Sequence, residues 1–289
     1  MLNKFILGSA NFGLNYGVAN GHGKLSYDKI NKIVLAAEKH NIRSIDTAPA
    51  YGNAESILGK IGIHNFNIIT KLRGLRSNNW ENVLNSFKLS HKDLRLYDRP
   101  IHTILAHDPT EISGVDYKTV AYNLSKLRDL GYATKVGLSI YSEHQCGQIT
   151  TQFKPDVIQV PFNILDQRAK NSNLLEYLKS KGCEIQVRSI FLQGLLAQNK
   201  MYLPKSLNKY SNEVKKLFDF CHSQNISLRT LALKWVDSQS WIDNIVIGLD
   251  TIEQFHQLVI DLKSTINLDE KALRDMSSSN LNLIEPYRW

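Results

Sequence analysis

The chain alternates between short apolar runs rich in β-branched residues and longer stretches in which apolar residues recur every three or four positions. The short runs predict buried strands, and the longer stretches predict amphipathic helices. The expected strands cover residues 4–7, 42–45, 67–70, 103–106, 135–138, 157–160, 184–187 and 244–247. The expected helices begin after Ser26 and then cover residues 54–60, 80–89, 117–130, 174–180, 214–221, 228–236 and 252–262.

The regular alternation of strands and helices predicts how these elements are arranged. Gly131 and Gly182 each follow a predicted helix and lead into the next strand, as helix-ending glycines do. Eight interleaved strands of this kind favour an α/β fold, a (β/α)8 or TIM barrel, over an antiparallel sandwich. No linker divides the chain, so we expect one domain over residues 1–289. Residues 193–208 form a long loop that is a candidate lid, and residues 271–289 are expected to pack on the outside.

Composition and charge restrict the setting in which this barrel works. The 289 residues are 43% hydrophobic and 21% charged, which is ordinary for a globular protein. Three separated cysteines predict neither a disulfide framework nor a thiolate zinc site. The net charge of +8 is dispersed along the chain, so nucleic acid is not an expected partner. No apolar run approaches the roughly 18 residues that a membrane helix needs, and we expect a cytoplasmic protein.

Four chemically complementary side chains follow three consecutive predicted strands. Asp46 and Tyr51 come after the second strand, Lys71 directly ends the third, and His107 follows the fourth. In a parallel barrel the reactive groups lie at the carboxyl ends of the strands, where all the βα loops open. A lysine beside a tyrosine favours the phenolate, a carboxylate holds the lysine, and a histidine orients a carbonyl oxygen. We therefore expect an acid–base centre in which Tyr51 is the general acid.

Two other kinds of site are disfavoured. Side chains alternate along a strand and no three or four donors converge around His107, so no metal is expected. The glycines near the N-terminus lack the Gly-x-Gly-x-x-Gly spacing of a dinucleotide fingerprint, so a Rossmann fold is not indicated either.

Residues 44–55 carry a known signature. Their sequence, Ser-Ile-Asp-Thr-Ala-Pro-Ala-Tyr-Gly-Asn-Ala-Glu, resembles the Asp-Thr-Ala…Tyr-Gly…Glu signature of the aldo/keto reductase family, and the likeness extends from residues 7–10 to the strand at 246–248. The resemblance implies a catalytic tetrad of Asp46, Tyr51, Lys71 and His107, with Tyr51 as proton donor. It also implies a nicotinamide coenzyme and a small-molecule carbonyl substrate.

The resemblance further implies a set of coenzyme contacts. Ser139 and Gln159 stand where the family holds the nicotinamide carboxamide, although Ile140 replaces the usual asparagine. Arg188 and Ser189 replace a Tyr-Ser pair, and the arginine plane is suited to stack on the nicotinamide ring. The last βα turn corresponds to the loop that binds the adenosine ribose and its phosphate, through Gly248, Thr251, Gln254 and Gln257.

The preferred coenzyme is left open between NADP(H) and NAD(H). Gln254 stands where NADPH-preferring relatives place an arginine, and no Lys or Arg lies between Gly248 and Leu258. A 2′-phosphate therefore lacks its usual charged partner in this turn.

Fewer residues in the sequence point to the substrate-binding part of the site. Phe12 and Tyr16 are expected to form an apolar wall, and Asn163 to face the same mouth. Three arginines near strand ends are candidates to bind a phosphate or carboxylate: Arg73, Arg76 and Arg168. The loop sequences resemble a bacterial subgroup linked to surface-sugar biosynthesis, which implies a sugar or nucleotide-sugar carbonyl.

Three functions remain in view at this point. The first is reduction of an aldehyde or ketone by hydride transfer from NAD(P)H, with Tyr51 as general acid. The second is an aldolase-type reaction through a Schiff base on Lys71. The third is a coenzyme-binding regulatory subunit without turnover.

Overall fold

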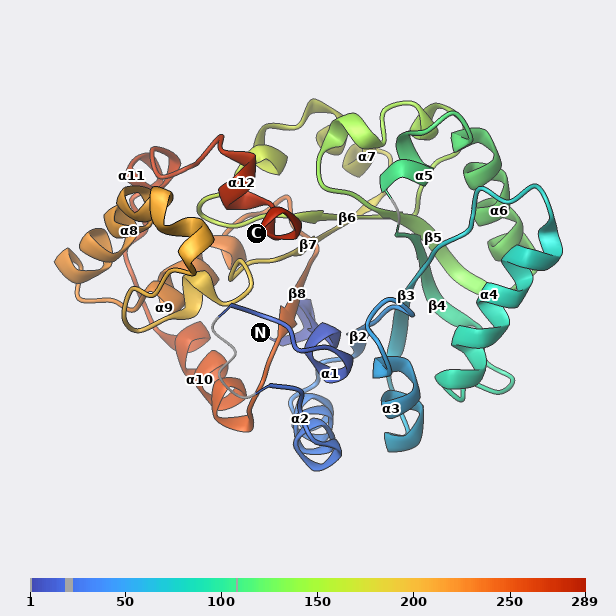
Figure 1. Cartoon of the computed structure of the whole chain (residues 1–289), viewed down its shortest axis with the longest axis horizontal. Helices are drawn as coiled ribbons and strands as arrows, with labels where there is room; N and C mark the ends of the chain where they lie inside the picture. Colours follow the sequence, from blue (N-terminus) through green and yellow to red (C-terminus); the bar gives the residue numbers. More distant parts are fainter. Residues whose placement is uncertain (1, 19–22, 108) are drawn as a thin grey trace.

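The computed structural model describes residues 2–18, 23–107 and 109–289, and its centre is a closed barrel of eight parallel strands (Figure 1). Each strand pairs with its neighbours in chain order, and β8 closes the ring by pairing with β1. The strands are β1 (Phe5–Gly8), β2 (Ser44–Asp46), β3 (Asn67–Leu72), β4 (Ile101–Ala106), β5 (Ala133–Ser139), β6 (Val157–Pro161), β7 (Glu184–Arg188) and β8 (Asn244–Gly248). The predicted (β/α)8 fold is confirmed.

Helices surround the barrel and cover its outer face (Figure 1). The longer ones are α2 (Tyr27–Lys39), α3 (Ala54–Ile61), α4 (Trp80–Asp93), α6 (Tyr117–Asp129), α7 (Asn173–Ser180), α8 (Ser211–Ser223), α9 (Leu228–Asp237) and α10 (Ile252–Lys263). The shorter ones are α1 (Ala10–Gly13), α5 (Pro109–Ser113), α11 (Glu270–Arg274) and α12 (Leu281–Ile284). The side chain of Ser26 accepts a hydrogen bond from the Lys29 amide and so caps α2 as its sequence predicts.

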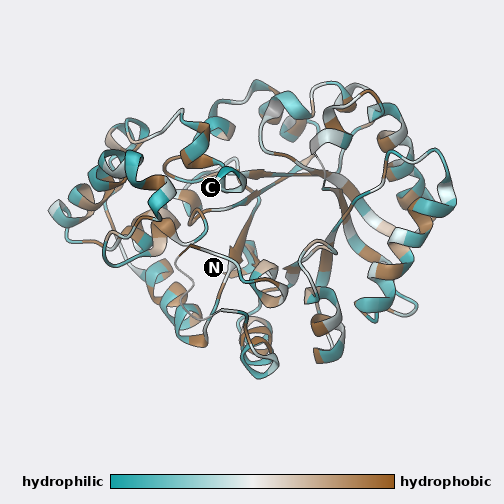
Figure 2. Ribbon diagram, viewed as in Figure 1, coloured by the Kyte–Doolittle hydropathy of each residue, from teal (hydrophilic) through white to brown (hydrophobic). Residues whose placement is uncertain are grey.

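The helices are not distributed evenly between the strands. The fully described connection from β5 to β6 contains only two short 3-10 turns, Glu143–Gln145 and Ile149–Thr151. The connection from β7 to β8 contains both α8 and α9. Apolar residues lie along the strands and on the inner faces of the helices, whereas the outer helix faces are polar (Figure 2).

The inside of the barrel is filled below its carboxyl end. Ile6, Ile69, Leu105 and Val157 come from four different strands and form a separate buried cluster. Lys71 lies two residues beyond Ile69 on the same strand and therefore points to the same face, one layer higher. The apolar cluster thus forms the floor on which the polar groups of the mouth stand.

The sequence led us to expect the C-terminal segment on the outside of the barrel. The end of this segment lies elsewhere. Its last residues run across the mouth of the barrel, where Pro286 and Tyr287 line the central cavity. The chain end lies inside the ring of helices in Figure 1. The anchor is ionic, because Arg168 Nη1 donates a hydrogen bond of 2.8 Å to Glu285 Oε1. None of the helices in the described parts of the chain is both long and apolar enough to cross a bilayer.

Candidate active site

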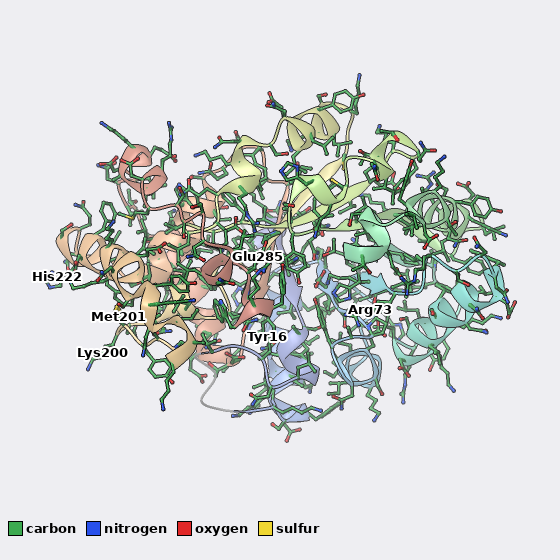
Figure 3. The ribbon with its side chains drawn as sticks, turned by 45° about the horizontal axis from the view of Figure 1, so that its top comes forward. Tyr16, Arg73, Lys200, Met201, His222 and Glu285 are labelled. Atoms are coloured by element: carbon green, nitrogen blue, oxygen red, sulfur yellow. The ribbon has the colours of Figure 1, made fainter. Side chains whose placement is uncertain are left out.

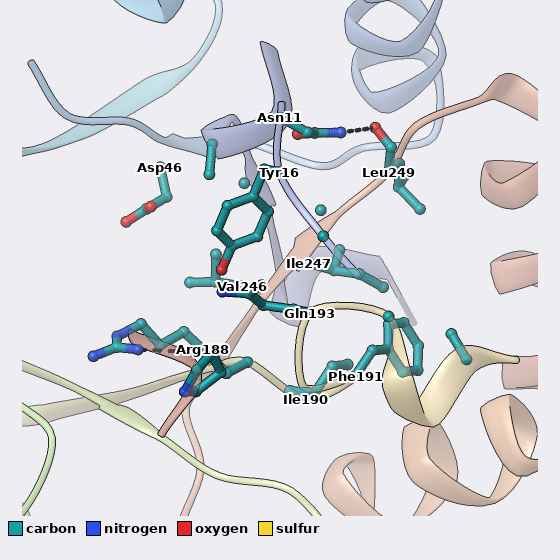
Figure 4. A pocket seen from close by; sticks show the side chains of 18 of the residues that line it. Asn11, Tyr16, Asp46, Arg188, Ile190, Phe191, Gln193, Val246, Ile247 and Leu249 are labelled. Atoms are coloured by element: carbon teal, nitrogen blue, oxygen red, sulfur yellow. Dashed lines mark hydrogen bonds between the residues drawn. The ribbon is translucent and has the colours of Figure 1, made fainter. Parts of the chain in front are cut away.

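The carboxyl ends of the strands surround a cavity of about 550 Å³. Its walls come from loops that follow β1, β2, β4, β5, β7 and β8, together with the C-terminal segment. Of the predicted tetrad, Asp46, Tyr51 and His107 line this cavity, whereas Lys71 lies just beneath its surface. A close view shows the Tyr16 ring extending into the cavity, on the side where Asp46 and Arg188 also lie (Figure 4).

Lys71 joins the acid and the phenol. Its ammonium donates hydrogen bonds to Asp46 Oδ1, to Tyr51 Oη at 3.1 Å and to the Thr47 carbonyl at 3.2 Å. These three acceptors saturate the ammonium, which is 1% exposed. Burial alone would lower the pKa of Lys71, but the charge and hydrogen bonds of Asp46 and Tyr51 outweigh it and raise the pKa above the ordinary value. Lys71 is therefore held as a cation beside the phenol.

Gln159 orients the carboxylate. Its amide nitrogen donates to Asp46 Oδ2 at 2.8 Å and to Gln186 Oε1 at 3.2 Å. The side chain is completely buried and is not part of the cavity wall. The sequence predicted a contact with the nicotinamide carboxamide here. In the structure Gln159 holds the second oxygen of Asp46 from below.

Two glycines let the loop that carries Tyr51 come close to the first βα loop. A Cβ on Gly13 would lie 1.7 Å from the Tyr51 carbonyl oxygen, so only glycine fits at this approach. Gly52 has a φ of +62°, a left-handed conformation that glycine adopts without strain. The backbone of Tyr51 is thus held in place by contacts that no larger residue allows.

His107 faces Tyr51 across the cavity wall. The two rings are perpendicular, with centroids 6.0 Å apart. The His107 amide donates to the Leu72 carbonyl at 3.0 Å, which extends the β3–β4 pairing by one residue and fixes where the imidazole begins. Both rings therefore border the same part of the cavity.

The loop after β7 supplies the opposite wall. Ser139, Arg188 and Ser189 line the cavity. Asn163 does not line it. Its amide nitrogen donates to the Ser189 carbonyl at 3.1 Å, and its side-chain oxygen accepts from the backbone amides of Leu165 and Asp166. Ser189 and Gln193 have φ values of +60° and +54°, so this loop holds a tight and locally strained path.

The far end of the cavity lies against the last βα turn. Gly248 and Gln254, two of the residues expected to contact the coenzyme, line it. Thr251 instead caps α10 through its hydroxyl, and Gln257 donates to Asp261 at 3.0 Å, so neither belongs to the wall. The Gln254 side chain accepts from the Asp250 amide at 2.7 Å.

Asn11 and Arg229 are among the lining residues that the sequence analysis missed. Asn11 donates to the Leu249 carbonyl at 2.6 Å and to the Asp250 carboxylate at 2.9 Å. Arg229 reaches the cavity from α9, and its Nε donates to Asp261 at 2.7 Å. The position of Asn11 just after a predicted strand was a usable signal. The sequence gives no such signal for Arg229, because this residue lies within a helix and not at a strand end.

Unpaired polar atoms test whether this space suits a dinucleotide. Ser9 Oγ and Asn11 Oδ1 are buried and have no hydrogen-bond partner among the described residues. Both residues lie in the cavity wall, as do several glycines that leave room for close approach. A free hydroxyl and a free amide oxygen suit the carboxamide and hydroxyl groups of a nicotinamide coenzyme. The glycines let the backbone come close to its phosphates, so the residues fit the group.

Other predicted substrate contacts lie elsewhere. Phe12 is completely buried in the hydrophobic core, because α1 packs against α3, and it is not part of the cavity wall. Arg73 and Arg76 are exposed and lie outside the wall. Arg168 is held by Asp166 through two bonds of 2.8 Å and by Glu285, so each of its three nitrogens donates to a carboxylate within the protein. Within the described ranges, no three His, Cys, Asp or Glu side chains are grouped to hold a metal ion.

Solved structures of similar fold support this architecture. An aldo-keto reductase from Bacillus halodurans superimposes with a TM-score of 0.76 at 18% identity, over 99% of this chain and 95% of that one. A glycerol dehydrogenase from Gluconobacter oxydans gives a TM-score of 0.73 at 21% identity, over 99% of this chain and 93% of that one. At these identities the likeness is one of fold.

Sequence comparison identifies the family. A glyoxal reductase of Bacillus subtilis is 29% identical over 71% of this chain and 72% of its own length. An NADH-specific methylglyoxal reductase of Escherichia coli is 25% identical over 85% of this chain and 86% of its own length. The model of the aldo/keto reductase family matches residues 4–280. The chain therefore belongs to the aldo/keto reductase family and is an NAD(P)H-dependent oxidoreductase.

Proposed function

We propose that this enzyme reduces an aldehyde or ketone and that Tyr51 donates the proton to the carbonyl oxygen. The observation that carries the proposal is the chain of contacts from Asp46 through Lys71 to the Tyr51 hydroxyl, which ends at the cavity wall. When bound, NAD(P)H supplies the hydride that reaches the carbonyl carbon.

The residues divide the acid–base work among them. Tyr51 gives up its phenolic proton as negative charge develops on the substrate oxygen. The buried ammonium of Lys71 stabilises the phenolate that remains, and Asp46 keeps that ammonium in place. His107 borders the same space and orients the oxygen. Because the site is fixed before substrate arrives, little reorganisation is needed during the reaction.

The Schiff-base alternative receives less support from the geometry. An amine that attacks a carbonyl must be neutral and must reach the substrate. Lys71 has a raised pKa, is saturated by three acceptors and is not part of the cavity wall. Its arrangement suits an electrostatic role.

We further propose that NADH is accepted at least as well as NADPH. Asp250 lies in the wall at the far end of the cavity, and its charge disfavours a 2′-phosphate. Arg229 lies at the same end, but its charge is balanced by Asp261. The Escherichia coli relative described as NADH-specific supports this preference.

Small 2-oxoaldehydes are suitable first substrates, since the two relatives are described as glyoxal and methylglyoxal reductases. A sugar or nucleotide-sugar carbonyl is the second class that we propose. Both should be assayed with NADH and NADPH in parallel.

Substitution of Tyr51 by Phe tests the proposal. We expect turnover to fall by roughly 10²- to 10⁴-fold, the usual contribution of a general acid, while coenzyme still quenches protein fluorescence. Equal loss of turnover and coenzyme binding would make Tyr51 structural. Tight coenzyme binding by the unmodified protein without turnover on any carbonyl would favour the regulatory subunit instead.

A further inference from the structure

Arg188 places a positive charge at the catalytic end of the cavity. It is the last residue of β7 and lines the cavity together with Ser139 and Tyr141. Its guanidinium donates to the Ile140 carbonyl at 3.2 Å and to Ser189 Oγ at 3.4 Å, and its central carbon lies 4.7 Å from the centre of the Tyr141 ring. All of these partners are uncharged.

The charge of Arg188 is not balanced within the described parts of the chain, where no carboxylate lies within ion-pair distance of it. The other cations near the cavity differ in this respect. Lys71 is paired with Asp46, Arg229 with Asp261, and Arg168 with both Asp166 and Glu285. The catalytic end of the cavity therefore carries a surplus positive charge, which comes from Arg188.

Arg188 also keeps donors for a ligand. A guanidinium has five N–H groups in a planar fork, and the two hydrogen bonds to Ile140 and Ser189 leave three of them available. A fork with free N–H groups matches the oxygens of a carboxylate or phosphate. The contact with Tyr141 and the strained loop that begins at Ser189 hold the fork in one orientation.

Tyr16 lines the same cavity as Arg188 and Tyr51. In Figure 4 its ring extends into the cavity and its hydroxyl points toward Gln193. Burial, together with the nearby Tyr51, raises the pKa of Tyr16 to about 12, while Arg188 opposes the shift. Tyr16 is therefore within electrostatic reach of both Tyr51 and Arg188, which face the same part of the cavity.

We propose that Arg188 binds the carboxylate or phosphate group of an anionic carbonyl substrate, whose carbonyl then lies at Tyr51 and His107. This proposal rests on the reductase function proposed above. It makes Arg188 the residue that selects charged over neutral substrates. Tyr141 and Tyr287, whose rings lie 4.8 Å apart, form the wall beside the bound anion.

Matched pairs of substrates test the proposal. Glycolaldehyde phosphate is compared with glycolaldehyde, and 4-oxobutanoate with its methyl ester, so that phosphate and carboxylate are examined separately. We expect the unmodified enzyme to favour at least one anion by about tenfold or more in kcat/KM. In Arg188→Gln we expect that preference to fall by roughly 10- to 100-fold through KM, with the neutral partners changed by less than about threefold.

Two control variants accompany this measurement. Arg73→Gln removes an exposed arginine outside the cavity and should leave the preference unchanged. Figure 3 shows Arg73 well to the side of Tyr16 and Glu285. Arg188→Lys keeps the charge without the planar fork, so it should retain part of the preference. Unfolding temperatures establish that each variant is folded.

Coenzyme binding separates this role from stacking on the nicotinamide ring. We expect Arg188→Gln to bind NADH and NADPH with unchanged Kd. Weaker coenzyme binding with an equal loss on neutral and anionic substrates would overturn the proposal and assign Arg188 to the coenzyme. An unmodified enzyme that reduces neutral carbonyls without preferring either anion would also overturn it, while leaving the reductase function intact.

A binding measurement keeps the two proposals separable when no turnover is found. Succinate and glycerol phosphate are titrated into the protein saturated with coenzyme. If the unmodified protein binds these anions and Arg188→Gln does not, the anion site is supported. The lack of turnover then contradicts only the proposed reductase function. Absence of binding to the unmodified protein would overturn the anion site.

Discussion

The two sides of the cavity mouth are built in different ways. On the β2–β4 side, Asp46, Lys71 and Tyr51 form a closed network in which the two charges are paired and buried and the phenol reaches the cavity wall. On the β7 side, Arg188 is held by uncharged groups, and the wall is completed by a C-terminal segment that is attached through Glu285. The first side is suited to fixed chemistry. The second side leaves a cation without a carboxylate partner beside a wall formed by the chain end, which suits it to the recognition role proposed above.

Replacing Lys71 by Met is expected to break the closed side most severely. The substitution leaves the Asp46 carboxylate buried without its cation, which typically costs about 3–5 kcal/mol of stability. Turnover should be lost as well, because nothing then stabilises the phenolate. Chemical denaturation and steady-state kinetics measure the two effects.

A double variant distinguishes charge from shape. In Asp46→Asn with Lys71→Met neither charge remains, so most of the lost stability should return while turnover stays absent. If stability is not regained, the buried pair matters through its packing. If turnover returns, the role given to Lys71 is wrong.

The closed side is also the part that the sequence predicts best. Asp46, Lys71 and His107 lie at or just beyond strand ends, and the apolar runs place those ends to within one or two residues. In a parallel barrel, the ends of neighbouring strands must meet at one rim, so their side chains converge without further information. The spacing from Asp46 to Tyr51 adds a local motif of the family.

The recognition side could not be predicted in the same way. Arg168 was one of three candidates to bind a phosphate or carboxylate, but it pairs with Glu285, which is 117 residues away in the chain. The pattern of apolar residues does not predict such a contact, because both partners lie outside the strands. Likewise, the sequence of the C-terminal segment shows that it is short and partly helical, but not that its end crosses the mouth.

Glu285→Ala is expected to loosen the recognition side. The substitution removes the carboxylate to which both Arg168 and the Tyr287 hydroxyl donate hydrogen bonds. Arg168 then keeps only its ion pair with Asp166. We expect a loss of about 1–2 kcal/mol, which lowers the Tm of a protein this size by roughly 2–4 °C. KM for substrate should rise severalfold with kcat nearly unchanged, since the tetrad is not touched.

Glu270→Ala provides the matched control. Glu270 pairs with Lys170 at 3.0 Å, but it is exposed and is not part of the cavity wall. Such a surface pair contributes about 0–1 kcal/mol, so neither Tm nor KM should change appreciably. Equal changes in both variants would mean that the C-terminal segment does not form part of the substrate site.

The smallest expected effect concerns Glu55, which supports the closed side from behind β3. It is 4% exposed and accepts hydrogen bonds from Thr70 at 2.6 Å and from Ser90 at 3.1 Å. Burial raises its pKa above the ordinary carboxyl value, although the two hydroxyl donors oppose the shift. The folded protein therefore retains the Glu55 proton at a pH where the unfolded chain has lost it.

The sign of the resulting pH dependence follows from that difference in proton binding. Where the folded state holds more protons, stability falls as pH rises, so ionised Glu55 destabilises the protein above its ordinary pKa of 4.5. Glu55→Gln keeps an acceptor for Thr70 without ionising, and it should match the unmodified protein near about pH 4 and exceed it by about 1 kcal/mol or less near about pH 7. Thermal unfolding of both proteins across this range measures the difference. A difference of the opposite sign would mean that the positive charge of Lys71 reaches Glu55 through β3 and governs its ionisation, so that the closed network extends one residue deeper than its hydrogen bonds indicate.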